Sequence, residues 1–203
     1  MSRVTIKICG VRDAETARVA AEAGADFVGV VLVADSPRFV PPAAAAALAV
    51  AIADAGAMPV AVVRLPLDAD TQAALEAFPI VQFHGFEEPE DLARFTAWER
   101  WKGLAFTPES AARWLADGAV RRLVVDGAEA GSGDAWDVTG FAALRARDRA
   151  RCLLAGGLDE ANVADRIRAA QPWGVDVSSG VERARGVKDH ARIRAFIAAA
   201  RGA

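Results

Sequence analysis

The stretch Val4-Thr5-Ile6-Lys7-Ile8-Cys9-Gly10 sets a pattern that the rest of the chain repeats. Branched apolar residues alternate with Thr5, Lys7 and Cys9, which predicts a strand with those three side chains on one face. The glycine ends the strand, and an alanine-rich helical pattern follows it. Cys9 is therefore expected at the carboxyl end of a first strand, where it can face a pocket. Taken alone, a free cysteine is more often a small buried apolar residue.

Seven further apolar runs follow, and a helical stretch comes after each run. Strands are predicted at residues 4–8, 27–33, 59–63, 80–83, 101–105, 122–125, 151–155 and 174–177. Helices are predicted at residues 13–23, 42–55, 70–78, 89–97, 108–116, 138–146, 159–170 and 189–201. Strict alternation is typical of a parallel sheet covered by helices, and eight units favour a closed (β/α)8 TIM barrel. An open Rossmann-like sheet is the alternative, but no G-x-G-x-x-G motif follows the first strand.

The composition is that of an ordinary globular protein. The chain has 203 residues, of which 53% are hydrophobic and 25% charged, and its net charge is -3. No linker divides the sequence, so we expect one compact domain over residues 1–203 with short loops. The charge gives no reason to expect binding to nucleic acid or to an anionic membrane. Without a signal peptide or a long apolar span, the sequence favours a cytoplasmic protein.

Metal and disulfide chemistry are not indicated by the sequence. The only two cysteines, Cys9 and Cys152, lie far apart and cannot build a disulfide framework or a zinc cluster. The two histidines show no ligand spacing either. We therefore expect no metal.

In a barrel the active site lies at the carboxyl ends of the strands, so polar residues there are the candidates. Two glycine-rich turns, Gly156-Gly157 after the seventh strand and Ser178-Ser179-Gly180 after the eighth, are predicted to bind a phosphate through backbone N–H groups. Arg38, after the second strand, could hold a substrate carboxylate. Asp126, which ends the sixth strand among apolar residues, could have a raised pKa and act as a general acid.

Four more side chains are assigned to substrate binding. Asp176 lies inside the eighth strand, where a buried carboxylate needs a partner. Either Lys7 of the neighbouring first strand or a substrate hydroxyl could supply it, and the sequence leaves both open. Gln82 and His84 fall on one face at the end of the fourth strand, where they orient polar groups or satisfy backbone atoms.

Several segments, kept in order from the first strand to the last helix, resemble the phosphoribosylanthranilate isomerase family of tryptophan biosynthesis. They are Lys7-Ile8-Cys9-Gly10, Ala23-Gly24-Ala25-Asp26, Ser36-Pro37-Arg38, Val81-Gln82-Phe83-His84-Gly85, Ala155-Gly156-Gly157-Leu158, Asn162-Val163, Val175-Asp176-Val177-Ser178-Ser179-Gly180-Val181-Glu182 and Gly186-Val187-Lys188-Asp189. A segment such as Ala-Gly-Gly-Leu is a weak signal. The first strand together with the run ending at Glu182 is highly specific.

The resemblance implies an Amadori rearrangement of N-(5-phosphoribosyl)anthranilate to a 1-deoxyribulose 5-phosphate product, without a metal or an organic cofactor. It makes Asp126 the general acid that opens the ribose ring and Cys9 the general base that takes the proton from the sugar C2. Arg38 would hold the anthranilate carboxylate, and the two glycine-rich turns would hold the phosphate. The expected partner is thus a small phosphorylated substrate, and the protein itself is expected to be a monomer or a homodimer.

A base must be ionised, whereas a thiol with an ordinary pKa is mostly protonated at neutral pH. Lys7 lies on the same predicted face as Cys9, about 6–7 Å away along the strand. Its ammonium group favours the thiolate. We therefore hypothesise that Lys7 activates Cys9.

The chain departs from the usual family pattern at three places. Residues Gly29-Val30-Val31-Leu32 lack the aromatic residues common after the second strand, and Val62-Val63-Arg64-Leu65 carries an arginine in place of an asparagine. Residues 130–138 replace a Gly-Gly-Thr/Ser-Gly motif and the Phe-Asp-Trp that follows it. These changes bear on the fit around the anthranilate ring and on the loop after the sixth strand.

Two other functions remain as alternatives. One is the related aminoaldose isomerisation of histidine synthesis, but that family uses an aspartate at the end of the first strand and has phosphate turns in both halves of the barrel. The other is a barrel that binds phosphosugars without catalysis. A binder needs neither Cys9 nor Asp126, which argues against it.

Overall fold

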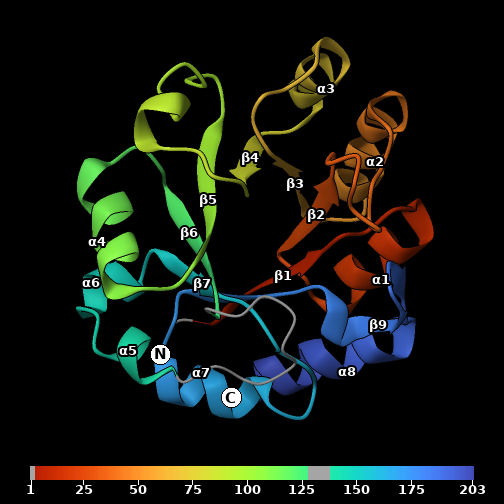
Figure 1. Ribbon diagram of the computed structural model, residues 1–203. Coiled ribbons are helices and arrows are strands. Elements are labelled where there is room, and N and C mark those ends of the chain that lie inside the picture. The colour runs from red at the N-terminus through yellow and green to blue at the C-terminus, as the bar shows by residue number, and fades with distance from the viewer. Residues whose placement is uncertain (1–2, 128–137) are drawn as a thin grey trace.

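The computed structural model describes residues 3–127 and 138–203. Within them, eight parallel strands close into a barrel in sequence order, and the helices surround the strands (Figure 1). The strands are β1 (Thr5–Cys9), β2 (Phe27–Val31), β3 (Met58–Val63), β4 (Ile80–Phe83), β5 (Glu99–Ala105), β6 (Arg122–Asp126), β7 (Cys152–Leu154) and β8 (Gly174–Val177). Because β1 pairs with both β2 and β8, the predicted TIM barrel is confirmed and the open sheet is excluded.

Helices and short 3-10 turns connect the strands. The helices are α1 (Ala14–Ala23), α2 (Pro42–Asp54), α3 (Ala69–Ala74), α4 (Pro108–Asp117), α5 (Thr139–Ala142), α6 (Ala146–Arg149), α7 (Val163–Ala170) and α8 (His190–Arg201). The 3-10 turns are η1 (Leu75–Ala77), η2 (Pro89–Leu92) and η3 (Ser179–Val181). None of the helices in the described ranges is long and apolar enough to cross a membrane.

Several predicted helices are wrong in extent: the helix predicted at 159–170 begins only at Val163, and the helix predicted at 70–78 ends at Ala74 and continues as the turn η1. The helix predicted at 89–97 is only the turn η2, because Phe95 packs on Phe83 with ring centroids 4.8 Å apart and β5 already starts at Glu99. The helix predicted at 138–146 is shorter, and α6 follows it as a separate helix. Arg149 donates to backbone carbonyls at the break, at 2.8 Å to Ala142, which satisfies groups that a longer helix would have paired. The altered residues 130–137 lie outside the described ranges.

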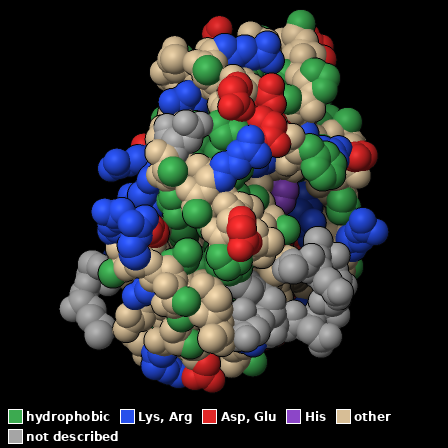
Figure 2. Space-filling view, turned by 60° about the vertical axis from the view of Figure 1, so that its left-hand side comes forward, with side chains coloured by type: hydrophobic (Ala, Val, Ile, Leu, Met, Phe, Trp, Pro, Cys, Tyr) green, Lys and Arg blue, Asp and Glu red, His purple; other side chains and the backbone are tan. Residues whose placement is uncertain are grey.

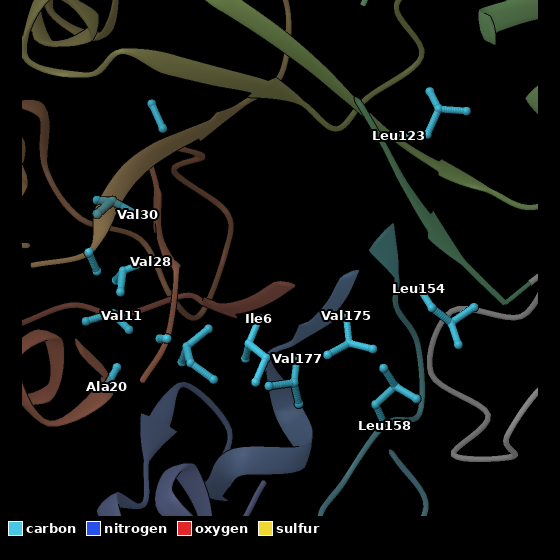
Figure 3. Close-up of a cluster of buried hydrophobic side chains, with 14 of the residues drawn as sticks. Ile6, Val11, Ala20, Val28, Val30, Leu123, Leu154, Leu158, Val175 and Val177 are labelled. Carbon is cyan, nitrogen blue, oxygen red and sulfur yellow. The ribbon is translucent and has the colours of Figure 1, made fainter. Parts of the chain in front are cut away.

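The strand register decides which side chains face the barrel interior. Lys7 lies opposite Asp176 of β8, and Cys9 lies opposite Gly29 of β2. The alternate residues Ile6 and Ile8 are fully buried on the other side of β1. Figure 3 shows Ile6 in the apolar layer between strands and helices, together with Val28 and Val175. The predicted alternation along the first strand is therefore confirmed.

Large apolar side chains fill the interior at the amino ends of the strands. Trp101 is fully buried there with Val60 and Leu153, and its ring lies 5.0 Å from that of Phe27 and 6.1 Å from that of Trp173. Burying a large apolar side chain contributes about 1.5–3 kcal/mol. Because this end is packed, a ligand can enter the barrel only from the carboxyl ends of the strands.

A hairpin that the sequence pattern did not predict follows β8. Its strands, β9 (Glu182–Ala184) and β10 (Val187–Lys188), pair antiparallel. Gly186 turns the chain between them with φ +78°, and a Cβ there would lie 2.4 Å from the carbonyl oxygen of Pro37. The hairpin therefore packs against the loop after β2, which brings Glu182 and Lys188 to the barrel mouth.

Candidate active site

A cavity of about 350 Å³ opens at the carboxyl ends of the strands. All of the predicted site residues except Lys7 line it: Cys9, Arg38, Gln82, His84, Asp126, Gly156, Gly157, Asp176, Ser178, Ser179 and Gly180. Val31, Val33 and Val62 add an apolar wall. In the space-filling view, a histidine and a basic side chain are visible inside a hollow, with acidic and basic groups interspersed around it (Figure 2). The barrel thus gathers residues from both ends of the chain into one pocket.

Lys7 lies deeper in the barrel than Cys9 and is fully buried. Its Nζ lies 2.8 Å from Oδ1 of Asp176, so Lys7 is the partner that the buried carboxylate requires. Burial alone would lower the pKa of Lys7, but Asp176 and Cys9 outweigh it and raise that pKa above its ordinary value. Lys7 therefore stays charged directly below the thiol.

Gly29 makes the approach of Lys7 to Cys9 possible. A Cβ at this position of β2 would lie 2.9 Å from Sγ of Cys9 and 3.3 Å from Cε of Lys7. Both side chains thus crowd the space that glycine leaves open. Any larger residue at position 29 would push the thiol or the lysine away.

Asp126 ends β6 and is half-buried at the pocket. Burial raises the pKa of its carboxyl above the ordinary value, the charge of Asp176 raises it further, and the N–H of Gly127 opposes both. Gly156 gives the carboxyl its room, since a Cβ there would lie 1.9 Å from Oδ1 of Asp126. A carboxyl with a raised pKa at a pocket wall can serve as a proton donor.

Gln82 and His84 share one face of the pocket, as predicted. Nε2 of Gln82 lies 3.2 Å from Nδ1 of His84, and Oε1 of the buried Gln82 has no hydrogen-bond partner among the described residues. The imidazole lies over Gly103 of β5, where a Cβ would come within 2.1 Å of Nδ1. Gly103 therefore holds open the space that His84 occupies.

The two glycine-rich turns lie against each other. Gly156 and Gly157 have φ of +81° and +62°, and a Cβ at Gly180 would lie 1.9 Å from the carbonyl oxygen of Leu158. Within the described residues, the N–H groups of Gly157, Ser179 and Gly180 have no acceptor. Adjacent N–H groups without acceptors form a cradle for an anion.

The hydroxyl of Ser178 is used inside the protein. It donates to the carbonyl oxygen of Cys9 at 3.1 Å and accepts from Nζ of Lys188 at 3.2 Å. The Ser178 hydroxyl is therefore occupied within the protein, whereas the side chain of Ser179 is exposed.

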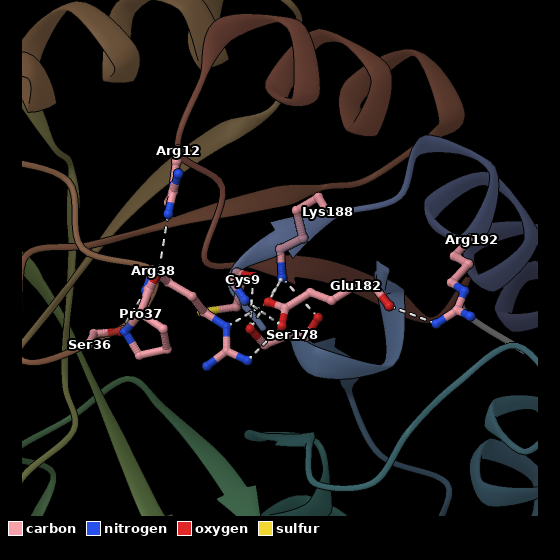
Figure 4. A network of polar contacts seen from close by, with 10 residues as sticks. Cys9, Arg12, Ser36, Pro37, Arg38, Ser178, Glu182, Lys188 and Arg192 are labelled. Atoms are coloured by element: carbon pink, nitrogen blue, oxygen red, sulfur yellow. Dashed lines mark hydrogen bonds and ion pairs between the residues drawn. The ribbon is translucent and has the colours of Figure 1, made fainter. Parts of the chain in front are cut away.

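Arg38 reaches the pocket from the loop after β2, and its guanidinium is held by Glu182. Nε lies 2.7 Å from Oε1 and Nη2 lies 3.0 Å from Oε2 (Figure 4). Lys188 also pairs with Glu182, at 3.0 Å. Neither Glu182 nor Lys188 is among the predicted site residues, although both stand in the segments that carry the resemblance. Their place depends on the hairpin, which the strand and helix periodicity did not indicate.

Arg64, the residue that departs from the family pattern, lies at the rim of the same pocket. It pairs with Asp35 of the loop after β2, and both side chains are exposed. The described part of the chain contains no group of three or more His, Cys, Asp or Glu side chains that could hold a metal ion. The pocket therefore offers a thiol above a buried lysine, a carboxyl with a raised pKa, an anion cradle and an arginine.

Comparisons with known proteins agree with this geometry. Residues 6–199 match the family model of N-(5'-phosphoribosyl)anthranilate (PRA) isomerase. The N-(5'-phosphoribosyl)anthranilate isomerase of Roseiflexus sp. (strain RS-1) is 42% identical to this chain, with 98% of this chain and 99% of that protein covered.

Two solved structures are also similar to this chain. For each of them the match covers 98% of this chain and 100% of the solved chain, at 31% sequence identity and a TM-score of 0.80. One is the dimeric phosphoribosylanthranilate isomerase of Thermotoga maritima in mutually generated monomers. The other is a phosphoribosyl anthranilate isomerase in complex with reduced 1-(o-carboxyphenylamino)-1-deoxyribulose 5-phosphate. This chain therefore belongs to the N-(5'-phosphoribosyl)anthranilate isomerase family, and it is an isomerase with a TIM-barrel fold.

Proposed function

We propose that this isomerase converts N-(5-phosphoribosyl)anthranilate to 1-(2-carboxyphenylamino)-1-deoxyribulose 5-phosphate in tryptophan biosynthesis. The observation that carries the proposal is the presence of Cys9 and Asp126 in one pocket with the anion cradle of the β7 and β8 turns. A structural relative is described in complex with the reduced form of this product. The substrate needs an acid, a base and two anion sites, and the pocket offers each of them.

The phosphate is assigned to the turns Gly156-Gly157 and Ser178-Ser179-Gly180. Their N–H groups that lack an acceptor within residues 3–127 and 138–203 can donate to the phosphate oxygens, and the contact of Gly180 with Leu158 keeps the two turns together. Holding the phosphate fixes one end of the substrate, which leaves the ribose between Cys9 and Asp126. Such positioning converts proton transfer into a step within one complex.

Asp126 is assigned as the general acid. Its carboxyl donates a proton to the ribose ring oxygen as the bond from that oxygen to C1 breaks, and the nitrogen lone pair forms a C1=N iminium that keeps its N–H proton. The raised pKa of Asp126 increases the fraction of molecules in which the carboxyl still carries its proton near neutral pH.

Cys9 is assigned as the general base. The thiolate removes the proton from C2, the electron pair of the C–H bond forms a C1=C2 double bond, and the C1=N pair of the iminium returns to nitrogen, which gives a neutral enolamine. The enolamine then tautomerises to the ketone as C1 gains a proton and the C2 hydroxyl loses one. The ammonium of Lys7 lies below the thiol and stabilises the thiolate.

Arg38 is assigned to the anthranilate carboxylate, and the apolar wall of Val31, Val33 and Val62 to its ring. Arg38 keeps N–H groups that Glu182 does not use, and a guanidinium edge suits a carboxylate. Gln82 and His84 are assigned to polar groups of the ribose, since Oε1 of Gln82 has no hydrogen-bond partner in the described part of the chain.

The proposal is tested in a tryptophan auxotroph that lacks this isomerase, together with turnover assays of the purified protein. Wild type is expected to restore growth, whereas Cys9→Ala and Asp126→Asn are not. Cys152→Ala removes the other buried cysteine, away from the pocket, and is expected to grow like wild type.

Soluble wild-type protein that neither restores growth nor turns over the substrate would overturn the proposal. If that protein still bound the reduced product, it would be a binding barrel without catalysis. Growth of both active-site variants at the wild-type rate would instead overturn the assignments of Cys9 and Asp126.

A further inference from the structure

Glu182 is a buried carboxylate that none of the proposed catalytic steps uses. Its side chain is 4% exposed and lies in β9, directly after the phosphate turn. Oε1 accepts from Nε of Arg38 at 2.7 Å and from Nζ of Lys188 at 3.0 Å. Oε2 accepts from Nη2 of Arg38 and from the N–H of Gly186, both at 3.0 Å. Both oxygens are thus shared by cations and a backbone donor.

The pair of bonds from Arg38 fixes the plane of its guanidinium. Two parallel N–H···O contacts leave one edge of the group free, and Nη1 of Arg38 has no acceptor among the described residues. The stem of Arg38 is fixed as well, because it lies over Gly10, where a Cβ would come within 2.4 Å of Cδ. Arg38 lines the pocket, so its free edge is the one available to a ligand there.

The same carboxylate joins Arg38 to the base and to the phosphate turn through Lys188. Nζ of Lys188 donates to the carbonyl oxygen of Ser178 at 2.8 Å, and the Ser178 hydroxyl donates to the carbonyl oxygen of Cys9 at 3.1 Å. Figure 4 shows Arg38, Glu182 and Lys188 converging beside Cys9 and Ser178.

Charge makes Glu182 necessary to this arrangement. Burial lowers the pKa of Lys188, and the nearby positive charge of Arg38 lowers it further. The carboxylate of Glu182 opposes both effects and favours the charged ammonium. Without the carboxylate between them, two cations would face each other at the pocket wall. Arg38, the more exposed of the two at 23% against 4%, would turn toward solvent.

We propose that Glu182 is a positioning residue that holds the free edge of Arg38 toward the substrate carboxylate. The inference rests on the proposed function, because it assigns Arg38 to that carboxylate. The inference predicts that loss of the Glu182 charge weakens the binding of substrates that carry the carboxylate. Binding of substrates without that carboxylate is expected to stay unchanged.

The test compares wild type with Glu182→Gln on two compounds, N-(5-phosphoribosyl)anthranilate and the aniline analogue that lacks the carboxylate. We expect Glu182→Gln to raise KM for the first compound by about 10-fold or more, the worth of one charge-assisted hydrogen bond, with a smaller change in kcat. KM for the aniline analogue should stay within about two-fold, which is below 0.5 kcal/mol. Arg38→Met should raise KM for the carboxylated compound, and adding Glu182→Gln to Arg38→Met should then change little.

Glu22→Gln is the matched control, since Glu22 pairs with Arg18 on the exposed face of α1. It is expected to leave both KM values unchanged. Glu182→Asp keeps the charge on a shorter side chain and should lie between wild type and Glu182→Gln; it also serves if Glu182→Gln does not fold.

An equal rise in KM for both compounds would overturn the inference, because it would mean that Glu182 supports the loop in general. If wild type turns over neither compound, the proposed function fails, and calorimetry decides the inference separately. In that case Glu182→Gln must weaken binding of the reduced carboxylated product while leaving inorganic phosphate binding unchanged. Equal affinities of both proteins for the reduced product would also overturn it.

Discussion

The ammonium of Lys7 lies 2.8 Å from the carboxylate of Asp176, in the interior of the barrel and directly below Cys9. The two residues stand opposite each other in β1 and β8, the strands whose pairing closes the barrel. The closure of the fold therefore also places a buried cation under the thiol. Asp176 neutralises that cation and raises the pKa of Asp126 across the pocket, so one ion pair acts on both proposed proton-transfer groups.

Replacing Lys7 tests whether it activates Cys9. In Lys7→Met we expect slower alkylation of Cys9 at neutral pH, because the nearest buried cation is gone. The single variant also leaves Asp176 buried without its partner, which costs about 3–5 kcal/mol of stability. The double variant Lys7→Met/Asp176→Asn removes that penalty and should still show the slower alkylation. An unchanged alkylation rate in the folded double variant would rule out the role of Lys7.

The raised pKa of Asp126 predicts the pH dependence of turnover. The productive form carries a protonated Asp126, so kcat/KM should fall as the pH rises through the raised pKa of Asp126 and the carboxyl loses its proton. Asp126→Asn should lower kcat by about 10²–10⁴-fold, the usual worth of a general acid. Asp165→Asn, on the exposed face of α7, is the control and should keep the wild-type profile. A wild-type rate for Asp126→Asn at any pH would contradict the assignment.

Gly103 is predicted to be essential to the position of His84. Gly103→Ala places a Cβ within 2.1 Å of Nδ1 of His84, so the imidazole must leave its place beside Gln82. We expect KM to rise while the thermal midpoint falls by only a few degrees. His84→Ala combined with Gly103→Ala should be no worse than His84→Ala alone. A strictly additive loss in the double variant would show that Gly103 acts elsewhere.

Gly180 is predicted to keep the phosphate cradle intact. A Cβ at Gly180 would lie 1.9 Å from the carbonyl oxygen of Leu158, so Gly180→Ala must separate the two turns. Each lost hydrogen bond to a charged group costs about 1.5–3 kcal/mol, or roughly 10- to 100-fold in binding. Affinity for inorganic phosphate, measured by calorimetry, should fall accordingly. Gly202→Ala meets no atom closer than 3.6 Å and should bind phosphate like wild type.

Glu182 is predicted to contribute stability that depends on pH. Burial would raise the pKa of its carboxyl, but Arg38, the N–H of Gly186 and Lys188 lower it from 4.5 to about 2. A depressed pKa in the folded state stabilises the protein above the unfolded pKa and loses that effect as the pH falls toward the folded value. Wild type should therefore be more stable than Glu182→Gln at pH 7 in urea unfolding. The difference should narrow between about pH 4.5 and 2. A constant difference over that interval would contradict the prediction.

Much of the site could be predicted from local sequence because its residues stand at recognisable places in the strand pattern. Cys9 and Asp126 end strands, and Gly156-Gly157 and Ser178-Ser179-Gly180 form glycine-rich turns after strands. Glu182 and Lys188 were not predicted as site residues because they lie in a hairpin outside the strand–helix alternation. The roles of Gly29 and Gly103 could not be predicted for another reason, since each glycine makes room for a side chain from a different strand.

The alternation of strands and helices and the inward face of Thr5, Lys7 and Cys9 follow from local sequence alone, because periodicity and glycine act over a few residues. The partners of the buried charges depend on the three-dimensional fold. Lys7 meets Asp176 across 169 residues of chain, and Arg38 meets Glu182 across 144. Such pairs form only when the barrel closes and its loops meet at one end. Several partners of suitable charge exist for each residue in the sequence, and packing in three dimensions selects one.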